Sequence, residues 1–132
     1  MKDPQFKEEQ IDLIRSILGE FYYALLYPED FKKVLGVENE TVLKIFNKID
    51  IFRENLEKNK TFFDEWGIYD PDIPLEFHLN FSLEEIQIIK ICFEKITNYL
   101  DDWDIDTRLG NWSDENESLR LKLKELLSAE KT

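Results

Sequence analysis

Three aspartates at alternate positions resemble a metal-binding motif more than any other residues of this chain do. Asp102, Asp104 and Asp106 lie in the segment DDWDIDTRLGNWS with the spacing of the first three ligands of an EF-hand calcium loop. Such a loop needs glycine at its sixth position and glutamate at its twelfth, where this chain has Thr107 and Ser113. The pattern is therefore incomplete, and we expect neither a metal site nor a cofactor.

The single histidine and the single cysteine are the other candidates for chemistry. Cys92 lies on the apolar stripe of a predicted helix, where a free cysteine usually behaves as a small buried hydrophobe. His78 lies on the polar side of an alternating segment, so we expect it to face solvent or a neighbouring loop. One histidine and one cysteine also do not make a structural zinc site. We therefore expect no catalytic residue, and an enzyme of unknown class is only the third interpretation.

The charge of the chain bears on its partners. The 132 residues include 29 Asp and Glu against 17 Lys and Arg, which gives a formal net charge of −12. Binding nucleic acid needs clustered Lys and Arg to contact phosphates. A helix-turn-helix drawn through FKKVLGVENETVLKIF would begin its recognition helix with Glu38 and Glu40, which repel phosphate. We therefore expect no nucleic-acid partner and expect a basic protein partner instead.

The number of cysteines and the length of the apolar segments indicate the cellular compartment of the protein. Cys92 has no second cysteine to pair with, which indicates a reducing compartment. The start, MKDPQFKEEQ, lacks the apolar segment of a signal peptide. The longest apolar-looking run, ILGEFYYALL, contains Glu20 and is too short to span a bilayer. These features predict a cytoplasmic protein that does not bind membranes.

The hydrophobic pattern predicts a mainly α-helical single domain over residues 1–132. Apolar residues recur at helical spacing in four longer segments, and Pro28 opens a short helix that Gly36 ends. Ser82 and Glu85 form a capping box in front of one of the long segments. The expected bundle has helices over residues 5–27, 28–36, 39–58 and 82–100, and a last one from residue 113 onward.

A small β element is expected around residues 62–81, between the third and fourth long segments. Every second residue from Ile73 to Phe81 is apolar, as in a strand with one buried face. The segment is either a lone strand or one half of a hairpin with residues 62–69. An exposed edge strand is a template for pairing, so a homodimer joined through residues 75–79 is an alternative function.

Acids and large aromatic residues alternate in two segments of the second half of the chain. Residues 61–132 hold seventeen acids against seven bases, whereas residues 1–60 hold twelve against ten. The acids either complement helix N-termini and remain solvated, or form one surface for a basic partner. In the second interpretation the contact residues are Trp66, Tyr69, Glu76, His78, Trp103, Asp104, Asp106 and Trp112.

The leading hypothesis is a small binding module that occupies the basic surface of another protein. Acidic single-domain proteins of this size include bacterial immunity proteins, which neutralise a toxin, and phage inhibitors that imitate the charge of nucleic acid. The chain resembles them in character only and shares no motif with them. We therefore expect an immunity- or inhibitor-type function, with association steered by charge.

Overall fold

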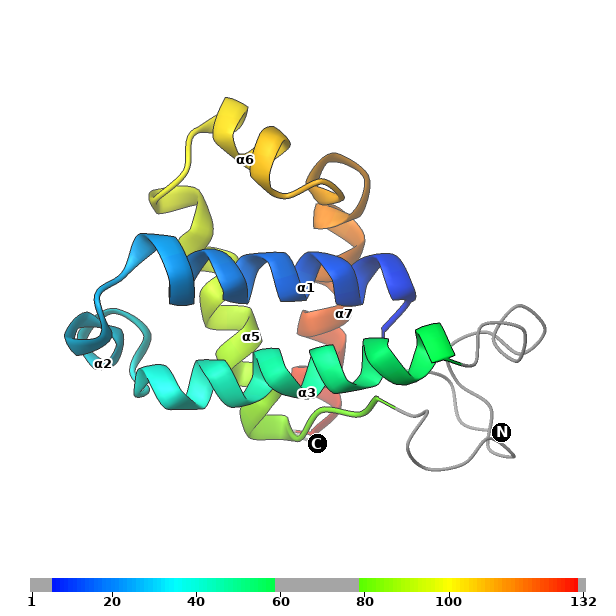
Figure 1. Ribbon diagram of the computed structural model, residues 1–132. Coiled ribbons are helices and arrows are strands. Elements are labelled where there is room, and N and C mark those ends of the chain that lie inside the picture. Colours follow the sequence, from blue (N-terminus) through cyan, green and yellow to red (C-terminus); the bar gives the residue numbers. More distant parts are fainter. Residues whose placement is uncertain (1–5, 59–78, 131–132) are drawn as a thin grey trace.

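The computed structural model describes residues 6–58 and 79–130, which are mainly α-helical (Figure 1). This confirms the prediction of a mainly α-helical fold. None of these residues forms a strand. The α-helices are α1 (Glu8–Glu20), α2 (Phe31–Leu35), α3 (Asn39–Lys58), α5 (Leu83–Lys95), α6 (Asp102–Arg108) and α7 (Trp112–Glu130).

The first predicted helix continues beyond α1 as a π-helix over Phe21–Leu25. The side chain of Gln10 accepts a hydrogen bond of 2.8 Å from the backbone N–H of Lys7 and so caps the start of α1. At the other end, the backbone of Leu26 is extended, and a 3-10 turn over Pro28–Asp30 leads into α2. The helical segment predicted over residues 5–27 is confirmed over residues 8–25, whereas Phe6, Lys7, Leu26 and Tyr27 are not helical.

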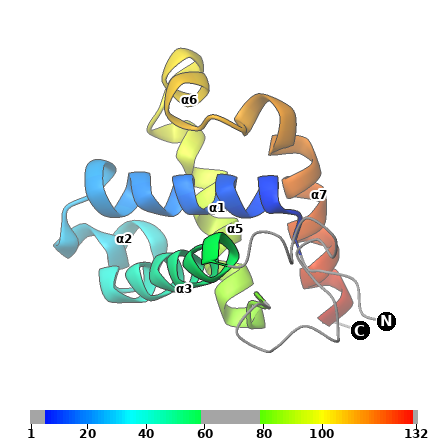
Figure 2. The ribbon, with the colours of Figure 1, turned by 45° about the vertical axis from the view of Figure 1, so that its right-hand side comes forward.

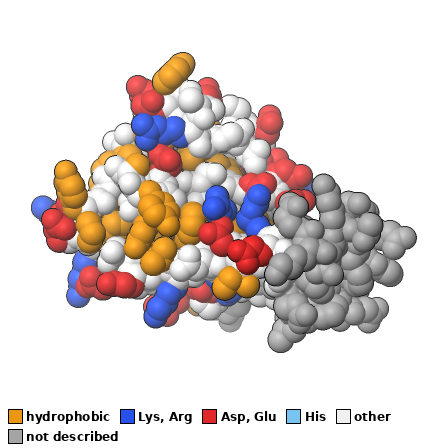
Figure 3. Space-filling model, viewed as in Figure 1, with side chains coloured by type: hydrophobic (Ala, Val, Ile, Leu, Met, Phe, Trp, Pro, Cys, Tyr) orange, Lys and Arg blue, Asp and Glu red, His pale blue; other side chains and the backbone are white. Residues whose placement is uncertain are grey.

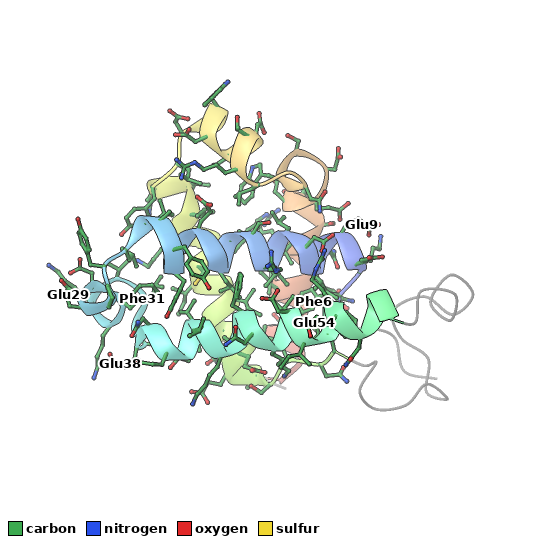
Figure 4. The ribbon with its side chains drawn as sticks, viewed as in Figure 1. Phe6, Glu9, Glu29, Phe31, Glu38 and Glu54 are labelled. Atoms are coloured by element: carbon green, nitrogen blue, oxygen red, sulfur yellow. The ribbon has the colours of Figure 1, made fainter. Side chains whose placement is uncertain are left out.

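The short helix α2 ends where its sequence predicts. Gly36 follows it with φ 81°, a left-handed conformation that glycine adopts without strain. Phe31 points from α2 toward the interior and is 1% exposed, whereas Glu29 and Glu38 lie on the outside of this end of the molecule (Figure 4). The next helix, α3, has the bounds that the sequence predicts.

Helices α1 and α3 lie side by side and antiparallel (Figures 1 and 2). Two ion pairs join them, because Arg15 Nε lies 2.5 Å from Asp50 Oδ1 and Arg53 contacts Asp12. Between the helices, Gly19 leaves room for a side chain of α3. A Cβ at Gly19 would lie 3.0 Å from Cε2 of Phe46, so the glycine permits the close approach.

Helices α5 and α7 complete the core on the other sides of α1, which contacts α3, α5 and α7. The predicted capping box opens α5: Glu85 N–H donates to Ser82 Oγ (3.1 Å), and Ser82 N–H donates to Glu85 Oε1 (2.9 Å). A 3-10 turn over Ile96–Asn98 ends this helical segment, close to the predicted end at residue 100. The last helix, α7, begins one residue before the predicted Ser113.

The predicted β element is wrong where the structure describes it. Residues 62–78 lie outside the described residues, and residues 79–81 do not form a strand. Leu79 and Phe81 are 8% and 4% exposed, as the alternation predicts, but they pack into a core of helices. The carbonyl of Asn80 accepts a hydrogen bond from Lys48 Nζ (2.6 Å) rather than from a neighbouring strand. The described end of the proposed dimer edge, Leu79, is therefore buried.

Candidate functional site

A short helix that the sequence analysis did not predict carries the aspartates of the failed calcium motif. Asp101 caps α6 by accepting a hydrogen bond of 2.8 Å from the backbone N–H of Asp104. Ile105 and Leu109 are 3% and 0% exposed and attach the helix to the core. Acids in the first turn and Arg108 in the last turn complement the helix dipole. These features make DDWDIDTR a helix.

The helical conformation places Asp104 on the opposite side of α6 from Asp102 and Asp106. Successive side chains of an α-helix are about 100° apart, so Asp104 lies about 200° from each of the other two and the three carboxylates do not converge on one ion. Asp106 instead accepts a hydrogen bond from Ser113 Oγ (2.8 Å), at the start of α7. Within residues 6–58 and 79–130, no group of three or more His, Cys, Asp or Glu residues is placed to hold a metal ion.

Trp103 projects from α6 and is 73% exposed. The neighbouring Asp101, Asp102 and Asp106 are exposed as well, and Asp104 is half-buried. Asp114 joins them, because the Asp106–Ser113 hydrogen bond holds the start of α7 beside α6. Figure 3 shows acidic side chains at this end of the molecule, the top of the view. We call this set of residues the acidic α6 surface: Asp101, Asp102, Trp103, Asp104, Asp106 and Asp114.

Two contacts with α1 fix the position of the acidic α6 surface. Arg108 NH1 lies 2.9 Å from Glu20 Oε1, at the end of α1. The hydrogen bond and charge of Glu20, with a smaller contribution from Asp104, raise the pKa of the Arg108 guanidinium. The side-chain amide of Asn111 donates to the carbonyl of Glu9 (3.3 Å), near the start of α1. Arg108 thus joins α6 to the end of α1 through its ion pair with Glu20.

The second predicted tryptophan contact has a different environment. Trp112 is half-buried and stacks on Phe93, with ring centroids 5.3 Å apart and an interplanar angle of 30°. It therefore joins the start of α7 to α5. A direct contact of Trp112 with a partner stays a prediction.

Other predicted residues lie elsewhere. Trp66, Tyr69, Glu76 and His78 are outside the described residues, so their part in a common surface stays a prediction. Cys92 is buried at 0% exposure, which confirms its prediction as a small core hydrophobe. Burial raises the pKa of the Cys92 thiol to about 12, which suppresses the thiolate that a nucleophile needs.

Two exposed tyrosines form a feature that the sequence analysis missed. Tyr23 and Tyr27 are 68% and 73% exposed. The ring of Tyr23 packs edge-on against the rings of Tyr22 (centroids 4.8 Å apart) and Phe46 (5.7 Å). The π-helix wraps its residues with a wider turn than an α-helix, so an α-helical projection does not predict which ring faces outward.

None of the helices in the described part of the chain is long and apolar enough to cross a membrane. Comparison of the chain with protein-family models, with curated proteins and with solved structures finds no match in any of the three.

Proposed function

We propose that the protein is a binding module that uses the acidic α6 surface to occupy a basic surface of another protein. Trp103 carries this proposal, because a tryptophan that is 73% exposed beside four aspartates is not accounted for by the fold. Isolated acids at a helix start are explained by the helix dipole, but an exposed indole is not. Tryptophan is enriched among the residues that dominate binding energy in protein interfaces.

The two kinds of side chain would have separate tasks. The aspartates attract a basic partner over distances of about 10 Å at 0.1 M salt and so increase the association rate. Trp103 fills a pocket of the partner and slows dissociation. Because Asp101 caps α6 and Arg108 and Asn111 fix it to α1, the surface is preorganised, and little conformational entropy is lost on binding.

A biological action follows from this chemistry. A protein that covers a basic surface with acids blocks that surface for nucleic acid or for another acidic ligand. We therefore propose an immunity- or inhibitor-type protein that neutralises a basic toxin or a nucleic-acid-binding protein, with nanomolar-range affinity.

The test is to isolate the partner and to measure both rate constants. The full chain is immobilised and proteins of its host are captured at low and at high salt. Stopped-flow measurements on the captured basic protein then compare the wild type with Trp103→Ala and with Asp102→Asn/Asp106→Asn. We expect the tryptophan variant to raise the dissociation rate at least about tenfold and the double variant to lower the association rate about tenfold.

Matched variants on other surfaces serve as controls. Tyr27→Ala removes an equally exposed aromatic ring, and Glu40→Gln/Glu54→Gln removes two exposed charges from α3. Both should leave the two rate constants within about twofold of the wild type, a change of about 0.4 kcal/mol. Binding that is indifferent to salt, or that Trp103→Ala and Tyr27→Ala weaken equally, would contradict the proposal.

A further inference from the structure

A groove runs between α5 and α7, two helices that lie side by side (Figures 1 and 2). It consists of two adjoining open hollows of about 260 and 280 Å³, which share Lys90 and Glu94. The first hollow is lined in addition by Phe93, Arg120, Leu123 and Lys124, and the second by Gln87, Ile91 and Leu127. We call this feature the α5–α7 groove.

The sequence spacing explains how the two helices form a continuous groove. The lining residues of α5 include positions 87, 90, 91 and 94, and those of α7 are positions 120, 123, 124 and 127. Both sets follow the i, i+3, i+4, i+7 spacing of a single helix face. Such a face is about two turns, or ~10 Å, long. The groove is therefore shaped along the helix axes.

The floor of the groove is apolar. Phe93 and Leu123 are 7% and 1% exposed and belong to the core, and the half-buried Ile91 and Leu127 pack against that core. Apolar side chains that remain partly exposed in a concave surface gain free energy when another apolar group covers them.

The rim of the groove is basic, although the chain has a net charge of −12. Lys90, Arg120 and Lys124 face one acid, Glu94. Lys90 pairs with Glu94 (Nζ–Oε1, 3.2 Å), and Arg120 pairs with Glu117 on its own helix. Lys124 forms no ion pair with any other residue in the described ranges. Because Lys90 and Arg120 are each paired with an acid of their own helix, the uncompensated positive charge of the groove lies on its α7 side, at Lys124.

We propose that the α5–α7 groove binds an amphipathic helix of another protein, with acids beside its apolar stripe. Packed helices have interaxial distances of about 8–10 Å. At this distance from α5 and α7, the apolar side chains of a bound helix contact Ile91 and Leu127. Acids on its flanks meet Lys90 on one side and Lys124 on the other. Charge complementarity selects this occupant, since the lining holds three bases against one acid, and Lys124 is a base without an acidic partner in the described ranges. The surface is distinct from the acidic α6 surface and opposite to it in charge.

Two synthetic peptides of about 14 residues, which is about 21 Å of helix, test this proposal on the full chain. Both carry leucine at i, i+3, i+4 and i+7; one has glutamate at the flanking positions and the other has lysine. Methyl resonances of Ile91, Leu123 and Leu127 report contact with the groove. We expect the glutamate peptide to shift these resonances with micromolar affinity and the lysine peptide to leave them unchanged.

Charge-reversal variants then separate the contact of the peptide with Lys124 from the effect of the net charge of the protein. Lys124→Glu should weaken binding of the glutamate peptide about three- to tenfold. Lys44→Glu changes the net charge equally on the exposed side of α3 and should alter the affinity less than about twofold, a change of about 0.4 kcal/mol. Neither residue contributes to the core, so both variants should fold like the wild type.

Three outcomes would overturn the proposal. The first is that both peptides shift the groove methyls equally, which would indicate unspecific apolar contact. The second is that the glutamate peptide shifts none of them at millimolar concentration. The third is that Lys44→Glu and Lys124→Glu weaken binding equally. A further experiment adds vesicles that contain anionic lipid instead of a peptide. A flat bilayer does not reach the floor of a groove, so only a lipid that enters the groove would shift the methyl resonances of Ile91 and Leu127. Such a shift would assign the groove to a lipid and overturn the proposal.

Discussion

Lys48 Nζ, in α3, lies 2.9 Å from Oε1 of Glu85, the third residue of α5. The same carboxylate oxygen accepts the backbone N–H of Ser82 at 2.9 Å. Lys48 also donates to the carbonyl of Asn80 (2.6 Å) and lies 5.3 Å from the ring centroid of Phe81. One ion pair therefore attaches both the start of α5 and the segment before it to α3.

This ion pair should make stability depend on pH in the acidic range. Burial raises the pKa of Glu85, but the hydrogen bonds from Ser82 and Lys48 and the charge of Lys48 outweigh it, so the pKa lies below the usual 4.5. The contribution of Glu85 is complete above pH 4.5 and is lost as the pH falls through the lowered value. Glu85→Gln should thus lower the free energy of unfolding at pH 7 by about 0.5–1 kcal/mol.

Urea unfolding of both proteins from pH 7 to pH 2 checks this prediction. The difference between wild type and Glu85→Gln should shrink steadily below pH 4.5. The neighbouring Glu84→Gln removes an exposed carboxylate of the same helix turn and controls for the loss of one negative charge at pH 7. A difference that stays constant down to pH 2 would mean that the charge of Glu85 does not contribute.

A second prediction concerns the contact between Gly19 and Phe46. In an open helix, Gly→Ala stabilises a protein by about 1 kcal/mol. Here the new Cβ would lie 3.0 Å from Phe46, whose ring is held by Arg15 (4.6 Å) and Tyr23 (5.7 Å). We expect Gly19→Ala to lower the free energy of unfolding by about 1 kcal/mol, because the ring has little freedom to move.

A double-mutant cycle separates the steric term from the helix propensity. Adding Phe46→Leu to Gly19→Ala should cost less than Phe46→Leu alone, since the smaller side chain accepts the Cβ. Gly110→Ala, in the turn between α6 and α7, is a control for the steric term alone, because nothing lies within 4 Å of a Cβ at this position. It should be neutral or should stabilise by up to about 1 kcal/mol. If Gly19→Ala and Gly110→Ala stabilise equally, the helices do not approach as closely as described.

Local sequence rules account for most of the described helices. The bounds of α3, the capping box of α5 and the glycine after α2 follow from periodicity and from cap chemistry. These features depend on residues within a few positions of each other, so they can be predicted from the sequence without knowledge of tertiary contacts.

The features that the sequence analysis missed depend on tertiary contacts. Helix α6 has few apolar residues that reach the core, namely Ile105 and Leu109, so its helical periodicity is weak. Its aspartates have the spacing of metal ligands, whereas Asp101 in fact caps a helix. Residues 79–81 alternate as a strand does, but their backbone bonds to Lys48. The α5–α7 groove arises from how two helices approach each other, which no local pattern specifies.

A third prediction concerns the reactivity of Cys92. Burial raises the pKa of its thiol to about 12, so the thiolate is nearly absent at pH 8 and the sulfur is inaccessible. A thiol reagent such as iodoacetamide should modify the native protein orders of magnitude more slowly than the protein in urea. Modification monitored by mass spectrometry checks this. Labelling of the native protein at the rate of a free thiol would contradict the burial of Cys92 in α5.

The two described tryptophans should separate stability from binding. Trp112→Ala removes a half-buried ring that stacks on Phe93 at 5.3 Å, and it should lower the free energy of unfolding by about 2 kcal/mol. Trp103 is 73% exposed, so Trp103→Ala should change this quantity by less than about 0.5 kcal/mol. Urea unfolding followed by circular dichroism measures both without relying on tryptophan fluorescence. Equal destabilisation would show that Trp103 supports the fold, and the reason for assigning it to a partner would be lost.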